Sequence, residues 1–387
     1  MTVHGQLGEH KTTVLLIDDQ AIVGAAVGRM LSNEPDIDFH FCQDPSKAIK
    51  TAIEVSPTVI LQDLVMPDVD GLMLLKFYRS NEKTRDIPVI VLSSKEEPVI
   101  KAKAFELGAS DYLVKLPDKI ELIARIRHHS KGYISLLERN EVMKRLAAEL
   151  AEAADYVKKL LPETVSGELF GTDWRFVPST SLGGDSFGYH WLDEENFSIY
   201  LLDVCGHGIG AALLSVSAMN VIRSQTLPDT DFRKPDRVLA SLNEAFQMDS
   251  HNGMYFTIWY GVYSKSSREL VYASAGHPPA LLVGRDGAAK TLGTQNMMIG
   301  AFPGVQYVSD SITLEGPSRL FVYSDGTYEI QIPPNNEMWP FESFVELMAS
   351  PPSDGASRLD RLWDFVVKAQ GSAALDDDFS ILEINFK

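Results

Sequence analysis

The chain has 387 residues, of which 53 are acidic and 35 are basic, so its formal net charge is −18. At roughly 150 residues per domain, this length predicts two or three domains. The acidic balance argues against a nucleic-acid partner, because such binding relies on clustered Lys and Arg. No uncharged apolar run approaches the roughly 20 residues needed to cross a bilayer, so no membrane partner is expected. With two cysteines and no apolar signal region, we expect a cytoplasmic location.

The first third of the chain alternates buried strands with amphipathic helices, which predicts a doubly wound parallel sheet. Asp18 and Asp19 follow the apolar run VLLI, and Asp63 follows TVIL. The carboxyl ends of parallel strands lie at one edge of the sheet, where ligands bind. Three carboxylates there repel one another unless a hard cation joins them, so they predict one Mg²⁺ site. Alternatively, such aspartates are turn formers and helix N-caps, which is our interpretation of Asp68 and Asp70.

Two further polar residues end neighbouring strands, Ser93 and Lys115. They supply a hydrogen-bond donor and a positive charge for an acyl phosphate on Asp63. Residues 12–130 with these features resemble the receiver domain of two-component response regulators. The resemblance implies that Asp63 is the phosphoacceptor and that a histidine kinase or phosphotransfer protein is the partner. It also places Tyr112 at the switch aromatic position beside the switch residues Ser93 and Lys115.

The stretch after the first segment carries apolar residues at alternating spacings of four and three, which is a heptad pattern. We predict a helical coiled-coil linker at 131–165 and a parallel homodimer. The alternative is one amphipathic helix that packs on its own domain. Asn140 and His129 are polar positions that reduce stability but fix the register. The full set of seam positions is Leu122, Ile126, His129, Tyr133, Leu136, Asn140, Met143, Ala147, Leu150, Ala154, Val157 and Leu161.

Residues 166–387 contain four acidic sites beside predicted strands. Three of them lie within three residues of a glycine, which lets a backbone carbonyl or a substrate phosphate approach a cation closely. Such a cluster of hard oxygen ligands suits two small divalent cations. The four aspartates are Asp185 in SLGGDSFGY, Asp203 in LLDVCGHG, Asp325 in VYSDGTYE and Asp377 in ALDDDFS.

A thiol or zinc site at Cys205 and His207 is the competing interpretation. A cysteine phosphatase needs an arginine about six positions after the thiolate, and residues 206–222 contain none. Zinc ligands need a second pair at CxxC or HExxH spacing, which is absent from the sequence. We therefore interpret Cys205 as a small packed residue and His207 as a hydrogen-bonded loop residue. His277 in SAGHPPALL is interpreted as a structural loop residue.

The segments KKLLPE, GMYFTIWYGVY and SAGHPPALLV accompany these acidic sites. Together they resemble the metal-dependent protein phosphatases (PPM family) of the SpoIIE/RsbU branch. The resemblance implies an αββα sandwich with two Mn²⁺ or Mg²⁺ ions. Asp203 would bridge both ions with help from the Val204 carbonyl, Asp325 and Asp377 would hold the second, and Asp185 would reach the first. One departure is Gly188, where the branch commonly has another Asp.

The sequence thus predicts an α/β receiver domain, a helical linker and an α+β phosphatase domain. The predicted function is a response regulator whose phosphorylation controls a serine/threonine phosphatase. By resemblance, the phosphoprotein substrate is an anti-sigma-factor antagonist of the STAS type. The alternative is a phosphorylation-controlled adaptor whose phosphatase-like domain is catalytically weak, which Gly188 keeps open. No helix-turn-helix pattern follows the first segment, so a DNA-binding output is not expected.

Overall fold

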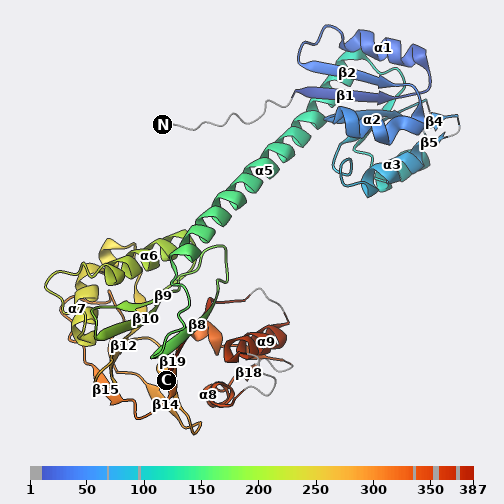
Figure 1. The fold of residues 1–387 in the computed structure, drawn as a ribbon. Coiled ribbons are helices and arrows are strands. Elements are labelled where there is room, and N and C mark those ends of the chain that lie inside the picture. The colour runs from blue at the N-terminus through green and yellow to red at the C-terminus, as the bar shows by residue number, and fades with distance from the viewer. Residues whose placement is uncertain (1–10, 68, 95–96, 334–336, 352–356, 372–374) are drawn as a thin grey trace. The chain divides into compact units, whose positions relative to one another are not determined.

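The computed structural model describes residues 11–67, 69–94, 97–333, 337–351, 357–371 and 375–387 (Figure 1). The chain divides into two compact units, Met1–Ala147 and Ala148–Lys387. The predicted domain boundaries at residues 130 and 165 stay predictions. The two units meet in sequence at residues 147 and 148, within one continuous helix that contains residue 130 and ends before residue 165. In the described part of the chain, no helix combines the length and the apolar character that a membrane crossing requires.

The N-terminal unit is built on a five-stranded parallel sheet in the order β2-β1-β3-β6-β7. Helices cover both of its faces, so alternate strand residues enter two separate apolar clusters. This arrangement confirms the predicted doubly wound α/β fold. The strands are β1 Thr12–Ile17, β2 Ile37–Cys42, β3 Val59–Asp63, β6 Val89–Ser93 and β7 Asp111–Val114. The helices are α1 Ala21–Leu31, α2 Ala48–Val55, α3 Gly71–Ser80 and α4 Pro98–Glu106.

A short hairpin precedes α3, formed by β4 (Val65–Met66) and β5 (Val69–Asp70). The side chain of Asp70 accepts a hydrogen bond from Leu72 N at 2.8 Å and caps α3. Its interpretation as an N-cap is therefore confirmed. Asp68 lies outside the described residues.

Helix α5 (Lys119–Leu160) is a single helix of 42 residues. Its first turns belong to the core of the N-terminal unit, because Leu122 and Ile126 are fully buried there. His129 Nε2 lies 3.0 Å from a carboxylate oxygen of Asp111, which also binds Arg125. The first residues of the predicted coiled-coil seam therefore pack inside the N-terminal unit and do not face a second helix. The part that remains exposed begins after Tyr133 and includes the predicted seam positions Asn140, Met143 and Ala147.

The C-terminal unit contains two antiparallel five-stranded sheets. One has the order β15-β12-β11-β10-β9 and the other β14-β13-β16-β19-β8. The strands of the first are β9 Ser186–Trp191, β10 Asn196–Val204, β11 Phe256–Ser264, β12 Glu269–Ala275 and β15 Asp310–Thr313. Those of the second are β8 Phe170–Val177, β13 Ala280–Gly284, β14 Ala289–Leu292, β16 Ser318–Tyr323 and β19 Phe379–Phe386. A further small hairpin joins β17 (Gln331–Ile332) to β18 (Glu337–Met338).

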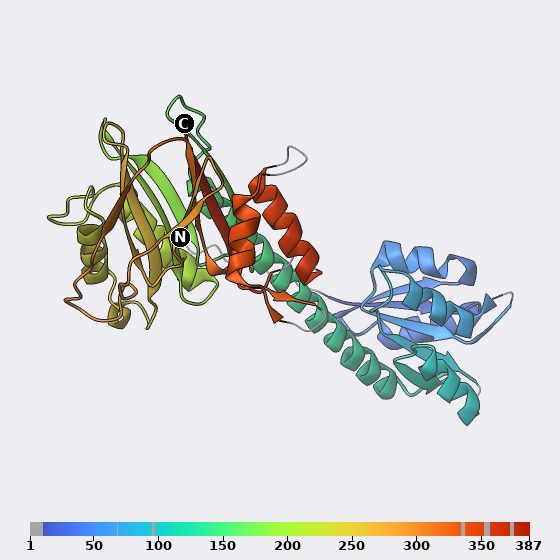
Figure 2. The same ribbon diagram turned by 90° about the horizontal axis from the view of Figure 1, so that it is seen from below.

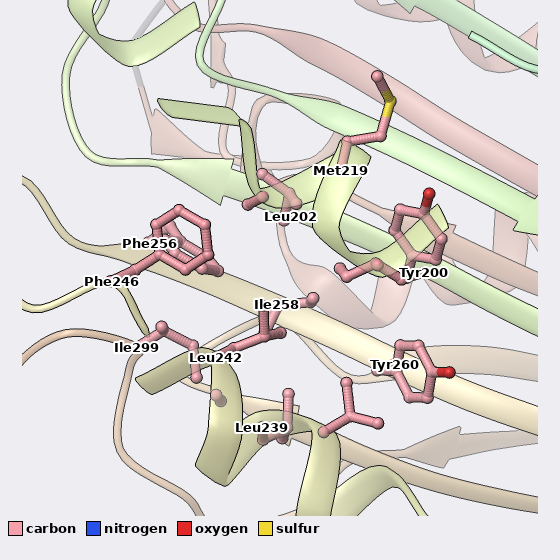
Figure 3. Close-up of a cluster of buried hydrophobic side chains, with 14 of the residues drawn as sticks. Tyr200, Leu202, Met219, Leu239, Leu242, Phe246, Phe256, Ile258, Tyr260 and Ile299 are labelled. Atoms are coloured by element: carbon pink, nitrogen blue, oxygen red, sulfur yellow. The ribbon is translucent and has the colours of Figure 1, made fainter. Parts of the chain in front are cut away.

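The two sheets stack face to face, and a pair of helices covers each outer face, which confirms the predicted αββα sandwich. Helices α6 (Ile209–Arg223) and α7 (Pro235–Ala245) pack on the first sheet through the apolar cluster of Figure 3. Helices α8 (Phe341–Ala349) and α9 (Arg358–Gln370), red in Figure 2, pack on the second sheet. Between the sheets, side chains such as Trp259 are completely buried.

Candidate functional site

The first candidate site lies at the carboxyl ends of β1 and β3. Asp18 and Asp19 follow β1, and Asp63 is the last residue of β3. Their carboxylate oxygens lie within 4.8 Å of one another, close enough to share one cation. Asp18 and Asp63 are almost completely buried. One oxygen of Asp19 is buried without a hydrogen-bond partner among the described residues. These residues fit a hard cation such as Mg²⁺, as the sequence predicted.

Lys115 supplies the positive charge of this site. Its ammonium lies 2.7 Å from Asp63 Oδ2 and 2.8 Å from Asp18 Oδ2. Burial raises the pKa of the Asp63 carboxyl, although the hydrogen bond from Lys115 opposes this shift. Asp63 Oδ1 also accepts a hydrogen bond from Val65 N at 3.2 Å. The phosphoacceptor candidate is therefore a buried carboxylate with a cation in contact.

The two other predicted switch residues lie on adjacent strands. Ser93 is fully buried at the end of β6, and its carbonyl accepts a hydrogen bond from Lys115 N at 2.9 Å. Tyr112 in β7 is 9% exposed, and the ammonium of Lys101 lies 5.3 Å from its ring centroid. The structure thus brings Ser93 and Lys115 to the edge that carries Asp63. Their roles in switching stay predictions.

The second candidate site lies at one end of the C-terminal sandwich. Asp185 immediately precedes β9, and Asp203 is the penultimate residue of β10, which pairs with β9 in antiparallel register. On the other sheet, Asp325 follows β16 and Asp377 precedes β19. Antiparallel pairing puts the end of one strand beside the start of the next. All four predicted carboxylates therefore come to the same end of the two sheets.

Asp185 is the most deeply placed of the four, with 1% of its surface exposed. Neither of its carboxylate oxygens has a hydrogen-bond partner among the described residues. Burial raises its pKa well above the usual value, and the charges of Asp203 and Asp378 raise it further. A buried carboxylate that accepts no hydrogen bond lowers the stability of the fold, because its charge has been removed from water without a compensating partner. A cation beside Asp185 would remove this cost.

The other three carboxylates also have raised pKa values. Burial raises the pKa of Asp203 to about 7, with additional contributions from the charges of Asp325 and Asp377. Partial burial of the carboxyl group is likewise the main cause of the raised pKa of Asp325 and of Asp377. These shifts show that the carboxylates of both sheets interact electrostatically. The donor set consists of hard oxygens, so it fits divalent cations such as Mn²⁺ or Mg²⁺.

Residues 182–185, called the GGD loop below, precede β9. Its two glycines, Gly183 and Gly184, let the loop backbone lie close to other groups of this site. A β-carbon on Gly184 would lie 2.6 Å from the Val204 carbonyl oxygen, the predicted backbone ligand. A β-carbon on Gly183 would lie 2.4 Å from Asp378 Oδ2. Both distances are shorter than any normal contact, so the loop requires glycine at each position.

Gly188 has a packing explanation. It lies in β9 opposite Tyr200 of β10, and a β-carbon there would lie 2.3 Å from the Tyr200 hydroxyl oxygen. Tyr200 is almost completely buried in the core under α6 and α7 (Figure 3). The Tyr200 side chain therefore occupies the space that an aspartate at position 188 would need.

The residues of the competing thiol interpretation have local structural contacts. Cys205 Sγ accepts a hydrogen bond from Tyr255 N at 3.2 Å, and Cys205 is a free thiol. His277 is buried, its Nδ1 lies 2.9 Å from Thr257 Oγ1, and burial lowers its pKa to about 3. His207 is exposed in the loop between β10 and α6. Its predicted hydrogen bond stays a prediction.

Asp378 had no predicted role, yet it lies between the loop that carries Asp185 and the segment that carries Asp325. Asp378 is 5% exposed and accepts hydrogen bonds from the backbone of the GGD loop, including Gly184 N at 2.6 Å. Its own carbonyl accepts a hydrogen bond from Ser324 Oγ at 3.1 Å. The triple aspartate at 376–378 offers no local signal that separates these three residues, because their difference arises from tertiary contacts.

Comparisons with known proteins agree with this geometry. Residues 14–127 match the response regulator receiver domain, and residues 193–387 match the Stage II sporulation protein E (SpoIIE) family. The chain belongs to the SpoIIE family. Its SpoIIE domain follows a receiver domain, as the sequence predicted.

Two curated relatives come from Bacillus subtilis (strain 168). Phosphoserine phosphatase RsbP is 32% identical over 185 residues, which cover 47% of this chain and 45% of RsbP. Phosphoserine phosphatase RsbU is 26% identical over 252 residues, which cover 64% of this chain and 72% of RsbU. The chain thus spans less than half of RsbP and about three quarters of RsbU.

Among solved structures, the SiaA-PP2C domain of Pseudomonas aeruginosa resembles the SpoIIE domain in fold. The match has a TM-score of 0.54 at 17% identity and covers 64% of this chain and 99% of the SiaA-PP2C domain. It supports the assignment of the αββα sandwich.

Proposed function

We propose that this protein is a metal-dependent phosphatase whose activity is controlled by phosphorylation of its receiver domain at Asp63. The observation that carries the proposal is the buried carboxylate of Asp185. It has no hydrogen-bond donor among the described residues and lies beside Asp203 at the shared end of the two sheets. Three further oxygen donors, from Asp325, Asp377 and the Val204 carbonyl, complete a set that suits two divalent cations.

The chain's own residues have separate roles in this reaction. Asp203 would help to hold both cations, because it lies at the end of the sandwich where the hydrogen bond from Gly184 N to Asp378 Oδ2 joins the two sheets. When bound, a pair of divalent ions lowers the pKa of a water molecule and neutralises charge on the phosphoryl oxygens. Gly183 and Gly184 keep side chains out of the space beside Asp378 and Val204.

The proposed substrate is a protein phosphoserine or phosphothreonine, on an anti-sigma-factor antagonist of the STAS type. Membership of the SpoIIE family and similarity to the phosphoserine phosphatases RsbP and RsbU support the reaction. The resemblance to the SpoIIE/RsbU branch supports the class of protein. A cytoplasmic location stays a prediction.

Receiver phosphorylation by a histidine kinase or phosphotransfer protein is the proposed input. Helix α5 is the proposed route to the SpoIIE domain, because its first turns are part of the receiver core. Its last turns line a cavity of about 220 Å³ with Leu182 and Gly183 of the GGD loop. The carbonyl of Leu160, the last residue of α5, accepts a hydrogen bond from Arg223 at the end of α6. We further propose that the exposed part of α5 forms a parallel coiled coil in a homodimer.

Hydrolysis of a chromogenic phosphate ester tests the catalytic proposal. We expect turnover that requires Mn²⁺ or Mg²⁺ and that stops on chelation. Asp203→Asn should lower the rate by about 100-fold or more, since loss of an outer partner of a metal ligand alone costs 10- to 100-fold. Cys205→Ala, the control in the same loop, should retain most of the activity.

Two outcomes would contradict the proposal. If the folded parent shows no metal-dependent turnover on the ester or on a phosphorylated STAS protein, the adaptor alternative is favoured. If Cys205→Ala loses as much activity as Asp203→Asn, the thiol interpretation returns.

A further inference from the structure

Asp378 differs from the four predicted ligands because its carboxylate is fully used by hydrogen bonds. Oδ1 accepts hydrogen bonds from Ser179 N at 2.8 Å and from Ser179 Oγ at 2.9 Å. Oδ2 accepts them from Gly184 N at 2.6 Å and, more weakly, from Asp185 N at 3.4 Å. A carboxylate offers about four acceptor positions, so little capacity remains for a cation.

The neighbouring carboxylate shows the opposite pattern. Asp185 is 1% exposed, compared with 5% for Asp378, yet neither of its oxygens accepts a hydrogen bond of normal geometry from a described residue. The nearby hydroxyls of Ser380 and Ser324 offset only part of the rise in its pKa. Its backbone N–H donates to Asp378, and the strand that it precedes, β9, pairs with β10, which carries Asp203. Asp378 therefore binds the backbone of the GGD loop, whereas the carboxylate oxygens of Asp185 remain available to coordinate a cation.

The loop is also held from the side of β10. The carbonyl of Gly184 accepts a hydrogen bond from Val204 N at 3.4 Å. The carbonyl of Leu182 accepts one from Gly208 N at 3.1 Å, at the start of α6. The GGD loop thus lies between β10 and Asp378, with contacts to both.

Asp378 is itself fixed by the segment that carries Asp325. Ser324 Oγ donates to the Asp378 carbonyl at 3.1 Å, and a β-carbon on Gly326 would lie 2.3 Å from the same oxygen. The Asp378 N–H donates to Asp377 Oδ1 at 2.8 Å. Asp378 therefore connects the segments of Asp185, Asp325 and Asp377, which approach it from both sheets.

We propose that Asp378 is a positioning residue that holds the GGD loop so that Asp185 faces Asp203, and that its loss weakens metal binding. This inference rests on the proposed function for the identity of the ligands. The hydrogen bonds themselves do not depend on it. A residue that orients a ligand through its backbone affects metal affinity more than the chemical step.

The first test is Mn²⁺ titration of Asp378→Asn, followed by calorimetry. The substituted amide presents an NH₂ group to one of the two sets of N–H donors, which breaks the hydrogen bonds on that side. We expect Mn²⁺ affinity to fall by about 10- to 100-fold. The rate of ester hydrolysis at saturating Mn²⁺ should largely recover, unlike the rate of Asp203→Asn. Asp376→Asn is the matched control, because it removes the same charge from an exposed carboxylate two residues away.

The second test is hydrogen exchange in the metal-free protein. In Asp378→Asn, the amides of Gly184 and Asp185 should exchange faster than in the parent and in Asp376→Asn, because they have lost their acceptor. Unchanged exchange together with unchanged Mn²⁺ affinity would overturn the positioning role. Since this measurement needs no metal, it decides the role of Asp378 even where the parent binds no Mn²⁺, a result that would overturn the proposed function instead.

A second variant covers the case in which Asp378→Asn does not fold. Gly183→Ala places a methyl group against Asp378 Oδ2 and separates the loop from the carboxylate without any change of charge. It should also weaken Mn²⁺ binding and speed exchange at Gly184. Wild-type affinity and exchange in a folded Gly183→Ala protein would contradict the proposal.

Discussion

At the scale of single residues, the carboxylates of the SpoIIE site reduce stability unless a cation is bound. Asp203 has a pKa of about 7 in the folded protein, compared with about 4 for an unfolded aspartate. The folded state therefore holds this proton more tightly. In the metal-free protein, the contribution of Asp203 to the free energy of unfolding is lost as pH rises from about 4 to about 7.

Because the Asp203 contribution to stability falls as pH rises, it predicts how thermal unfolding in the presence of a chelator depends on pH. Asp203→Asn cannot ionise, so its stability should fall less than that of the parent between pH 5 and pH 7.5. At pH 7.5 we expect Asp203→Asn to have a higher melting temperature than the parent. The difference should be roughly 2–4 °C for each 1 kcal/mol by which the substitution raises the free energy of unfolding. All five tryptophans lie in residues 148–387, so their fluorescence reports the SpoIIE domain. Equal pH dependence in the two proteins, or a parent that Mn²⁺ does not stabilise, would contradict the interpretation.

Gly188 provides a second test at this scale. Gly188→Ala places its β-carbon about one bond length too close to the Tyr200 hydroxyl, so we expect a loss of roughly 1–3 kcal/mol from overpacking. The β-carbon would also lie 2.5 Å from the ring carbon Cζ of Tyr200, so relief needs a shorter side chain. Tyr200→Leu removes both atoms, and the double variant should recover part of the loss. Tyr200→Leu alone is the control. If urea unfolding shows purely additive effects, Gly188 is not required by Tyr200.

At the scale of secondary-structure elements, α5 carries an exposed apolar stripe. Met143 is 60% exposed and Leu146 is 47% exposed, although both are apolar. Asn140 lies on the same stretch of helix and is exposed. A polar side chain in a coiled-coil seam lowers the stability of the dimer, so a rearrangement of the helices costs less free energy than in an all-apolar seam.

Asn140→Leu should therefore stabilise one arrangement of the proposed dimer. We expect tighter dimerisation by about tenfold or more, equivalent to roughly 1.4 kcal/mol, and a phosphatase rate that no longer responds to beryllofluoride. Asn140→Ala is the control, since it removes the amide without adding a large apolar side chain. Light scattering checks the association. A parent that is monomeric with and without beryllofluoride would contradict the coiled-coil dimer and favour another route of coupling.

Some secondary-structure elements could be predicted from local sequence patterns and others could not. Apolar runs that end in Asp18, Asp63 and Asp203 are local patterns, and they correctly predicted strands whose ends meet at an edge. The two sandwich sheets followed from resemblance to a family. The sequence left open whether Leu122 and Ile126 pack in the receiver core or in a dimer seam, because the same spacing of apolar residues suits a coiled coil and a packed helix.

The residues of the candidate site were likewise predicted from the sequence only in part. The four aspartates were recognised by their position beside strands and glycines. The role of Asp378 was missed, since Asp376, Asp377 and Asp378 are chemically identical in sequence. Their burial differs in the fold: Asp376 and Asp377 are exposed, whereas Asp378 is buried against the GGD loop. That difference depends on contacts with residues nearly 200 positions earlier in the chain.

In the whole molecule, one helix, α5, continues the chain from the receiver to the SpoIIE domain. The receiver site contains a buried phosphoacceptor candidate in contact with Lys115, and phosphorylation adds charge where that contact now exists. Such a change can control the SpoIIE domain only if α5 has two arrangements that differ in free energy between the two states.

The most direct test of this central claim is the Mn²⁺-dependent hydrolysis rate with and without beryllofluoride, a mimic of the phosphorylated aspartate. The full-length parent should hydrolyse a chromogenic phosphate ester, and its rate should change when beryllofluoride binds the receiver. Asp63→Ala should retain the basal rate and lose the response, because the acceptor carboxylate is gone while the SpoIIE site is intact. A parent without metal-dependent turnover, or an Asp63→Ala protein that still responds to beryllofluoride, would contradict the account.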